Sequence, residues 1–413
     1  MTRLLVVGCG FPQLSLVRAA KRRGHSVIGA DANRRAIAAV LCDEFHELST
    51  DDTEGLVALV RSSGATAVTT TGSELSLKTT AQLAERVGLP FYANPETVRR
   101  CQEKDAMRSG YVAAGLAVPR FAPCTTLGEA RAFARVNGFP LVVKPSRGWG
   151  QRGVARVQSD VELGVAFEEA RAHSAAAGLS VVVVEEWFEG REYSVNGWIE
   201  DGRLVSYCVT ERLTVAGHRP LGVMVAEVYP SGLAAADESR VVEEARRGAA
   251  ALGHLRGPCY SQVALGSRGC VLFETAARLG GGFDADVTKL ASGVDLYDRL
   301  LGVAVGDRAL EAQGKVAPPR GGAIAKFLVG RPGLVHSVRG LDEARSLEGI
   351  VDAQIFVPVG GRVLPLTDSA KRAAYVLAYG RSRAEATARA DEALAQLAIE
   401  TGDDPPGGLE ATK

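Results

Sequence analysis

The sequence has no excess of charge of either sign, since 48 Lys and Arg residues balance 48 Asp and Glu residues over 413 positions. A basic surface that would attract nucleic acid or an anionic membrane is therefore not expected. No apolar run approaches the roughly 18 residues of a membrane span. We expect neither nucleic acid nor a membrane among the partners, so any attraction for a charged substrate must come from local placement of side chains.

Cysteine is scarce and scattered. The seven cysteines are odd in number and form no CxxC pair, and the six histidines show no metal-ligand spacing. This pattern argues against a disulfide framework or a zinc site and favours a reducing compartment. The N-terminus begins on a strand-like run, without a cationic segment followed by a cleavable apolar one. These absences predict a cytoplasmic protein.

Residues 1–95 alternate between short apolar strands and helices, beginning with a β-α-β unit, which predicts an open parallel α/β domain. Gln13 stands where a dinucleotide fingerprint needs its third glycine, so a packing turn is favoured over a nicotinamide site. Glu74 follows a strand end and either reaches a ligand or begins the next helix. The expected strands are 3–8, 26–30, 65–71 and one beginning at 90–92; the expected helices are 13–23, 53–63 and 77–87.

A strand that carries a lysine leads into a glycine-rich loop. Residues 141–145 (LVVKP) include Lys144, and residues 146–153 (SRGWGQRG) include three glycines before a strand resumes. Backbone N–H groups of such a loop wrap phosphate oxygens, while the lysine supplies a point charge. The loop is not a Walker motif, because it lacks the GK[ST] ending and a following helix. The pattern favours a clamp for a polyphosphate over a surface hairpin.

A second apolar strand, at residues 179–186, ends in two acids and is followed by Trp187. Backbone groups at such a hinge can bond to a purine, and the aromatic ring can cover it. Glu192 can then accept hydrogen bonds from ribose hydroxyls. Glu185 and Glu186 are equally consistent with solvated charges at a strand end, so both interpretations stay open.

Residues 260–265 and 270–274 are short strands separated by GSRG, which predicts a β-hairpin. Alternation along its strands places Gln262 and Glu274 on one face as neighbours. Arg278 follows, and then three glycines let the backbone approach a ligand. An acid, a neutral oxygen donor and a guanidinium suit Mg²⁺ and a phosphate. An ordinary hairpin with a surface ion pair fits the same residues.

The rest of the chain continues the alternation of helices and strands, with a linker expected at 313–320 and a flexible tail at 402–413. The expected helical regions are 95–115, 126–137, 161–177, 237–252, 288–302, 341–346 and 383–397, and the expected extended segments are 118–123, 192–198, 202–209, 322–329, 351–357 and 362–366.

Taken in order, four segments resemble the ATP-grasp superfamily, and especially its carboxylate–amine ligases. They are EKDAMR with Lys104, LVVKPSRGWGQRGV, VVVEEWFEGREYSV and FETAARLGGGFDADVTKLASGVDLYDRLLG. The ETAAR form is similar to the ESAAR form of amino-acid (dipeptide) ligases. The resemblance implies an α/β chain with the ATP-grasp fold. Its expected parts are an N-terminal Rossmann-like domain (1–95), an ATP-grasp domain (96–312) with a lid at about 125–195, and a C-terminal α/β subdomain (313–401).

The resemblance also implies roles for individual residues. Lys104 and Lys144 match the lysines that hold nucleotide phosphates, and Arg278 matches the arginine that steadies the transferred phosphoryl group. Lys144 and Arg278 are thus the expected catalytic residues. Glu274 matches a Mg²⁺ ligand, and Gln262 stands at the position of another. The other expected ATP contacts are Ser146, Gly148, Gly150 and Gly153 in the loop, and Glu185, Glu186, Trp187 and Glu192 at the hinge.

The implied activity is ATP-dependent, Mg²⁺-assisted and ADP-forming. It joins a small-molecule carboxylate to an amine through an acyl phosphate, with an amino acid as the expected substrate and a homodimer compatible with the resemblance. The acceptor pocket is expected near residues 210–231, between the hinge strands and the following helix. The candidate substrate residues are Glu211, Arg212, His218, Glu227 and Gly281.

Two positions depart from the family pattern. Gln262 replaces an acidic metal ligand, and Ala276 replaces the asparagine that commonly follows Glu274 by two residues. An amide binds Mg²⁺ through oxygen but brings no charge, so weaker metal binding is expected and the number of ions stays open. The alternatives are a purine-biosynthesis or bicarbonate-using enzyme of this fold, a non-catalytic ATP-binding protein, and a nicotinamide oxidoreductase.

Overall fold

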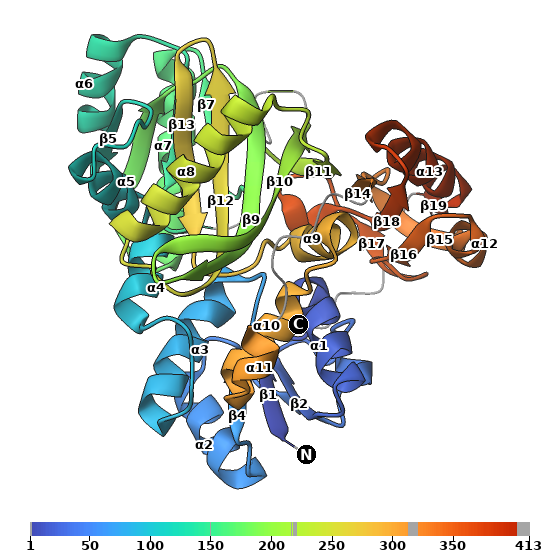
Figure 1. Ribbon diagram of the computed structural model, residues 1–413. Helices are drawn as coiled ribbons and strands as arrows, with labels where there is room; N and C mark the ends of the chain where they lie inside the picture. Colours follow the sequence, from blue (N-terminus) through green and yellow to red (C-terminus); the bar gives the residue numbers. More distant parts are fainter. Residues whose placement is uncertain (1, 149, 216, 218–220, 313–320, 403–413) are drawn as a thin grey trace, which may run out of the picture.

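The computed structural model describes residues 2–148, 150–215, 217, 221–312 and 321–402, which build four β-sheets with helices packed against them (Figure 1). The candidate His218, the predicted linker 313–320 and the predicted tail from residue 403 lie outside the described residues. Within the described ranges, no helix is both long and apolar enough to span a bilayer.

The N-terminal sheet has four parallel strands in the order β3-β2-β1-β4, as the α/β alternation predicts. Its elements are β1 (Arg3–Val7), α1 (Phe11–Arg22), β2 (Ser26–Asp31), η1 (Ala39–Leu41), β3 (Glu44–Glu47), α2 (Thr53–Ser63), β4 (Ala67–Thr69) and α3 (Glu74–Val87). The strand predicted to begin at 90–92 is wrong, because that segment bends and packs its Tyr92 ring against Gly257. The edge strand β3 was not predicted, since its sequence EFHE is mostly polar.

The lid is a four-stranded antiparallel sheet in the order β5-β8-β6-β7. Its elements are β5 (Phe121–Cys124), α6 (Leu127–Asn137), β6 (Leu141–Pro145), β7 (Ala155–Val157), α7 (Asp160–Ala176) and β8 (Val182–Glu186). A capping box between Thr126 and Glu129 starts α6, where both side chains satisfy amide groups at the helix end. The glycine-rich loop joins β6 to β7.

The central sheet has eight antiparallel strands in the order β13-β12-β9-β10-β11-β14-β18-β16. They are β9 (Arg191–Glu200), β10 (Arg203–Thr214), β11 (Met224–Tyr229), β12 (Gly257–Gly266), β13 (Gly269–Ala276), β14 (Gly322–Leu328), β16 (Ile350–Ile355) and β18 (Ala374–Gly380). The register pairs Gln262 with Glu274, which confirms the predicted hairpin face. Three of the strands after residue 321, β14, β16 and β18, extend the same sheet, so this part of the C-terminal region is continuous with the sheet that carries the hairpin.

The remaining elements are helices around this sheet and a small sheet in the order β17-β15-β19. They are α4 (Pro95–Gln102), α5 (Lys104–Ala113), α8 (Ala235–Ala251), α9 (Asp284–Ser292), α10 (Leu296–Val305), α11 (Arg308–Glu311), β15 (Gly333–Arg339), α12 (Leu341–Ser346), β17 (Arg362–Val363), η2 (Ser369–Lys371), α13 (Arg383–Gln396) and β19 (Ala398–Gly402). The single helix predicted at 288–302 is wrong. Gly293, with φ of 77°, ends α9 before α10 begins.

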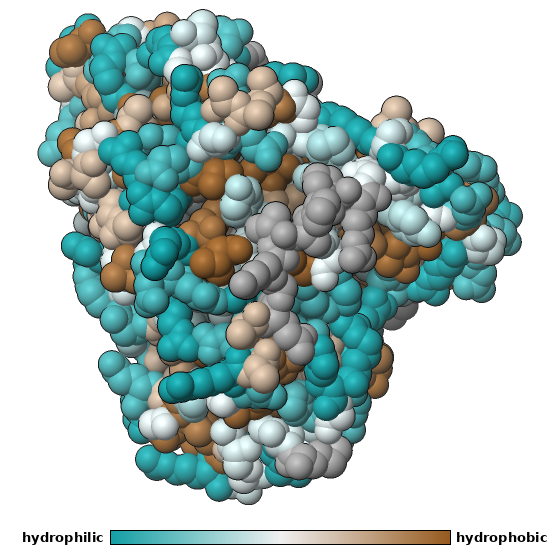
Figure 2. Space-filling model, in the orientation of Figure 1, coloured by the Kyte–Doolittle hydropathy of each residue, from teal (hydrophilic) through white to brown (hydrophobic). Residues whose placement is uncertain are grey.

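Three parts of the molecule meet near the centre of the view in Figure 1. The lid and the hairpin end of the central sheet form one lobe, the N-terminal sheet with α10 and α11 forms a second, and the C-terminal helices and strands form an arm. Figure 2 shows a largely hydrophilic surface, with brown apolar side chains gathered near the centre of this face. The fold thus brings the lysine-bearing strand β6, the hairpin and the N-terminal sheet to one place.

Candidate functional site: a charged cleft under the glycine-rich loop

A cleft lies between the lid, the central sheet and the N-terminal sheet. Its lining includes Glu74, Lys104, Lys144, Gly148, Gly150, Gln151, Arg152, Glu185, Glu186, Trp187, Phe188, Glu192, Arg212, Gly222, Gln262, Phe273, Glu274 and Arg278. The two predicted lysines, Lys104 at the start of α5 and Lys144 in the lid, therefore share one cleft with Glu274 of the hairpin and Arg278 after it. The candidates Ser146, Gly153, Glu211, Glu227 and Gly281 do not line it.

Three buried charges form a triad at the lid end of the cleft. Lys144 Nζ donates to Glu185 Oε2 at 2.7 Å, and Arg108 Nε donates to Glu185 Oε1 at 2.6 Å. Burial acts to raise the pKa of Glu185, but the charges of Arg108 and Lys144 outweigh it and hold the pKa at about 2. Burial and the nearby Arg108 lower the pKa of Lys144 to about 8. Glu185 is thus a fixed anion that positions Lys144. It is a buried partner of two cations and not a solvated charge at the end of a strand.

Lys104 connects the glycine-rich loop to the hairpin. Its Nζ donates to the Gly148 carbonyl at 3.2 Å and lies 4.0 Å from Glu274 Oε2. Burial acts to raise the pKa of Glu274, but Lys104 and Arg278 lower it below its usual value. Glu274 is therefore an anion beside two cations, which suits a place where phosphate and a divalent cation meet.

The glycine-rich loop bends sharply over the cleft. Gly150 and Gly153 both have φ of 67°, a backbone conformation that L side chains rarely adopt. Gly153 packs against the His173 ring on α7, so its role is to shape the loop. Ser146 is fully buried, and its hydroxyl donates to Asp105 at the start of α5. Its side chain therefore anchors the loop to α5 and does not face the cleft.

The hinge after β8 is held by bonds within the protein. The N–H of Glu186 donates to the Arg120 carbonyl, and the N–H of Trp187 donates to the Pro140 carbonyl. Both N–H groups are thus already bonded within the protein. A backbone N–H that donates to a purine would have to come from the residues that follow, of which Phe188 lines the cleft. The guanidinium of Arg156 lies 4.3 Å from the centroid of the Trp187 ring.

Gln262 and Glu274 are the candidate metal ligands. The Gln262 amide nitrogen donates to the Tyr260 hydroxyl at 3.1 Å, which leaves its carbonyl oxygen for other partners. The described residues contain no group of three or more His, Cys, Asp or Glu that could hold a metal by itself. Mg²⁺ needs only one or two protein oxygens when substrate phosphates supply the others. The pair therefore fits a Mg²⁺ ion shared with a nucleotide.

Arg278 faces the N-terminal domain. Its Nε donates to Glu74 Oε1 at 2.7 Å, while Glu74 Oε2 is buried and has no hydrogen-bond partner among the described residues. Burial acts to lower the pKa of Arg278, but Glu74 and Glu274 raise it above its ordinary value. Glu74 begins α3 and also lines the cleft, so both roles considered for it fit the structure.

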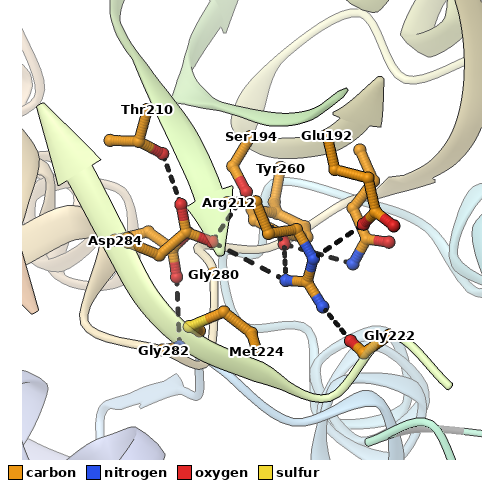
Figure 3. A network of polar contacts seen from close by, with 12 residues as sticks. Glu192, Ser194, Thr210, Arg212, Gly222, Met224, Tyr260, Gly280, Gly282 and Asp284 are labelled. Carbon is orange, nitrogen blue, oxygen red and sulfur yellow. Dashed lines mark hydrogen bonds and ion pairs between the residues drawn. The ribbon is translucent and has the colours of Figure 1, made fainter. Parts of the chain in front are cut away.

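Arg212 is the centre of a polar network behind the cleft (Figure 3). It donates to Glu192 at 3.2 Å, to the Tyr260 hydroxyl at 3.2 Å and to the Gly222 carbonyl at 2.9 Å. Glu227 lies beneath it, 3.6 Å from its Nη1, and accepts from Ser194 and Thr210. Glu192, the predicted ribose acid, is thus already oriented by a buried cation.

The candidate Glu211 is turned away from this network. Neighbouring residues of a strand point to opposite faces, and Glu211 pairs with Arg191 and Arg383 on the face opposite Arg212. Gly281 lies against the N-terminal domain, where an added Cβ would come within 2.6 Å of the Gly72 carbonyl. Neither position contacts the cleft, so a substrate contact from them has no structural support.

Three buried polar residues were not predicted from the sequence. Arg108 completes the triad with Glu185 and Lys144, and the Tyr260 hydroxyl accepts from Arg212. Asp284, at the start of α9, accepts from the Gly282 N–H through its Oδ2 at 3.0 Å. Arg108 lies four residues after Lys104 and so shares its helix face, which is the one signal that could have identified it. Nothing in the local sequence marks Tyr260, because its partners Ser194 and Arg212 come from other strands. Asp284 bonds to the nearby Gly282, but its place beside the charge of Arg212 depends on the fold.

Comparisons with known proteins agree with this geometry. Residues 137–286 match an ATP-grasp domain, and residues 326–402 match the L-amino acid ligase C-terminal domain 2. A protein of uncharacterized function from Sinorhizobium fredii is 28% identical over 81% of this chain and 67% of its own length. A D-alanine–D-alanine ligase from Marinobacter nauticus is 36% identical over 27% of this chain and 33% of its own length. The latter match thus spans only a third of that ligase.

The fold is shared over its whole length with a solved enzyme. The crystal structure of an L-amino acid ligase from Bacillus licheniformis superposes with a TM-score of 0.82 and 22% identity. The superposition covers 98% of this chain and 99% of that one. The ATP-grasp fold expected from the sequence is therefore confirmed.

Proposed function

We propose that this chain, a member of the ATP-grasp superfamily, is an ADP-forming ligase that joins an amino-acid carboxylate to an amine. The observation that carries the proposal is a single cleft in which Lys104 and Lys144 face Glu274 and Arg278. The match to the C-terminal domain of L-amino acid ligases supports an amino acid as one substrate. The boundaries proposed above for its three domains and a homodimeric state complete the proposal.

The nucleotide end of the cleft would be held by the lid. Lys104 and Lys144 would bind the ATP phosphates under the glycine-rich loop, Trp187 would cover the base, and Glu192 would accept from the ribose. Glu274 and the Gln262 carbonyl oxygen would hold Mg²⁺. A bound Mg²⁺ would neutralise charge on the phosphates.

The chemistry needs positioning and charge neutralisation rather than a protein nucleophile. An oxygen of the acid substrate attacks the terminal phosphorus of ATP, and the bond to ADP breaks to leave an acyl phosphate. The amine nitrogen then attacks the acyl carbon, phosphate leaves, and the nitrogen loses a proton. Lys144 and Arg278 neutralise the transferred group. Glu74 Oε2, which is buried without a partner among the described residues, would accept from a substrate ammonium group.

Two alternative functions would give different results in an assay. A non-catalytic ATP-binding protein is favoured by one observation, namely that Gln262 and Ala276 leave Glu274 as the sole carboxylate of the hairpin face. An enzyme of the same fold that uses bicarbonate or a purine intermediate would form ADP without needing two amino acids. The partners that we propose are small molecules alone.

The experiment is an ADP- and phosphate-release assay with ATP, Mg²⁺ and a panel of amino acids, singly and in pairs, followed by mass spectrometry of the products. We expect phosphate release that depends on two particular amino acids and an amide product of matching mass. Tight ATP binding without turnover would favour the non-catalytic protein. Phosphate release that depends on bicarbonate, with no amide product, would overturn the ligase.

A further inference from the structure

The glycine-rich loop is fastened to the C-terminal arm at its tip. The N–H of Ser369 donates to the Gly150 carbonyl at 2.9 Å, and the Ser369 hydroxyl donates to Gln151 Oε1 at 2.5 Å. Beside them, Arg152 Nε lies 3.6 Å from Asp368 Oδ2. Three successive loop residues thus contact two successive residues about 218 positions later in the chain.

The arm's side of this contact is rigidly built. Asp368 is 5% exposed, and its Oδ1 caps η2 by accepting from the Ala370 N–H at 2.9 Å. Arg372, which is 3% exposed, donates to the Ser369 carbonyl at 2.6 Å and to the Met224 carbonyl at 3.3 Å. The turn is therefore bonded to β11 of the central sheet through Arg372, independently of its contacts with the loop.

The loop's side adopts a conformation that it would not keep by itself. Gln151 has φ of 67°, which costs a residue with a side chain about 1 kcal/mol and persists only where surrounding contacts enforce it. Gln151 also lies against Gly222, whose carbonyl accepts from Arg212 in the network of Figure 3. Gly150, Gln151 and Arg152 all line the cleft.

We propose that Asp368 and Ser369 form a latch that holds the glycine-rich loop over the cleft. The latch positions the loop and contacts no substrate. Its second consequence rests on the proposed function: while the latch is closed, water is kept from the acyl phosphate until the amine arrives. The C-terminal arm then sets how much ATP is spent per amide formed.

The direct test is hydrogen–deuterium exchange of the full-length protein, read on peptides that cover residues 146–158 and 366–373. The variant Asp368→Asn/Ser369→Ala keeps a capping side chain at 368 but removes the charge opposite Arg152 and the hydroxyl bond to Gln151. We expect about tenfold faster exchange in the loop. Asp342→Asn, a fully exposed aspartate on α12 of the same arm, is the matched control and should not change it. Equal exchange in wild type and variant, with unchanged circular dichroism, would overturn the latch.

Two further measurements separate a latch from a general structural role. The first compares two double variants that both carry Asp368→Asn. The one with Ser369→Thr keeps the hydroxyl, so its loop should exchange more slowly than that of the one with Ser369→Ala. Arg152→Gln combined with Asp368→Asn should accelerate exchange less than the product of the single effects, because both changes remove one ion pair. Multiplicative effects would show that the two residues do not interact.

The functional consequence is tested by the ratio of phosphate released to amide formed. The latch variant should raise this ratio several-fold while Asp342→Asn leaves it at the wild-type value. If loop exchange rises but the ratio is unchanged, the shielding role is wrong. If loop exchange rises but wild type makes no amide with any substrate pair, the ligase proposal fails and the latch stands.

Discussion

The carboxylates at the two ends of the cleft differ in how many of their oxygens have hydrogen-bond partners within the protein. At the lid end, both oxygens of Glu185 accept from a buried cation, one from Arg108 and the other from Lys144. At the opposite end, Glu74 keeps one buried oxygen that has no partner among the described residues, as does Asp284 outside the cleft lining. The first arrangement is complete without a ligand, whereas the second is not.

This difference indicates that the two ends of the cleft have different roles in binding. A completed triad costs little reorganisation when a phosphate arrives, because Lys144 is already oriented. Buried oxygens without partners cost free energy, which a substrate that donates hydrogen bonds would recover. The difference therefore supports our proposal of a fixed nucleotide site at the lid end and a ligand-dependent substrate site at the end near Glu74.

The largest effect is expected when the completed triad is broken. Lys144→Ala should lower ATP-dependent phosphate release by about 100- to 1,000-fold, because it removes the donor that we propose for the transferred phosphate. It also leaves Glu185 with Arg108 as its only described cation partner. The measurement is turnover at saturating amino acids together with the ATP dissociation constant from calorimetry.

Two matched changes turn this result into a test of the comparison. Lys289→Ala removes an exposed ammonium that pairs with Asp295, far from the triad, and should leave turnover unchanged. Glu74→Gln alters the other end and should raise the KM of an amino-acid substrate without changing ATP affinity. If Glu74→Gln weakens ATP binding as much as Lys144→Ala does, the end near Glu74 is not a substrate site separate from the nucleotide site.

A smaller effect concerns stability and pH. Burial and the nearby Asp284 raise the pKa of Glu227 to about 8. The folded protein therefore holds a proton that the unfolded chain releases near pH 4.5, so this stabilisation is complete below that pH and is lost as pH rises through about 8. Glu227→Gln should remove this loss, which the two pKa values place on the order of 5 kcal/mol.

The measurement is the thermal midpoint of unfolding between pH 5.5 and 8.5. The fall of the midpoint with rising pH should be shallower in Glu227→Gln than in wild type. Glu392→Gln, at an exposed position on α13, should keep the wild-type slope. Parallel curves for wild type and Glu227→Gln would show that Glu227 does not hold its proton over this range.

Much of the fold could be predicted from periodicity and turns, and the reason is local. The predicted bounds of α2 and α12 match the structure, where Asp52 caps the start of α2 and Gly340 precedes α12. The Gln262–Glu274 neighbourhood follows from alternation along a hairpin. What could not be predicted depends on distant partners. The break between α9 and α10 required recognising Gly293 as a left-handed terminator, and a polar edge strand such as β3 has no periodic signal.

The candidate site divides in the same way. Residues inside a motif, such as Lys144 and Glu274, fall in the cleft as predicted, whereas loose candidates such as Glu211 were placed by charge alone and point elsewhere. Tyr260 links Gln262 to Arg212 across the sheet, a contact that no local pattern encodes. Tertiary pairing, not local propensity, decides which of the charged residues face the ligand.

The smallest effect we predict is at the metal pair, where Gln262→Glu would add a carboxylate beside Glu274. Two carboxylates bind Mg²⁺ more strongly than a carboxylate and an amide, so the apparent Mg²⁺ constant should fall about threefold to tenfold. The change also removes the amide donor to the Tyr260 hydroxyl, which limits the gain. Mn²⁺ titration followed by electron paramagnetic resonance, with ADP present, measures the affinity without turnover. Gln396→Glu, exposed at the end of α13, is the matched control. An unchanged or weaker affinity in Gln262→Glu would remove Gln262 from the metal site and leave Glu274 as its one protein ligand.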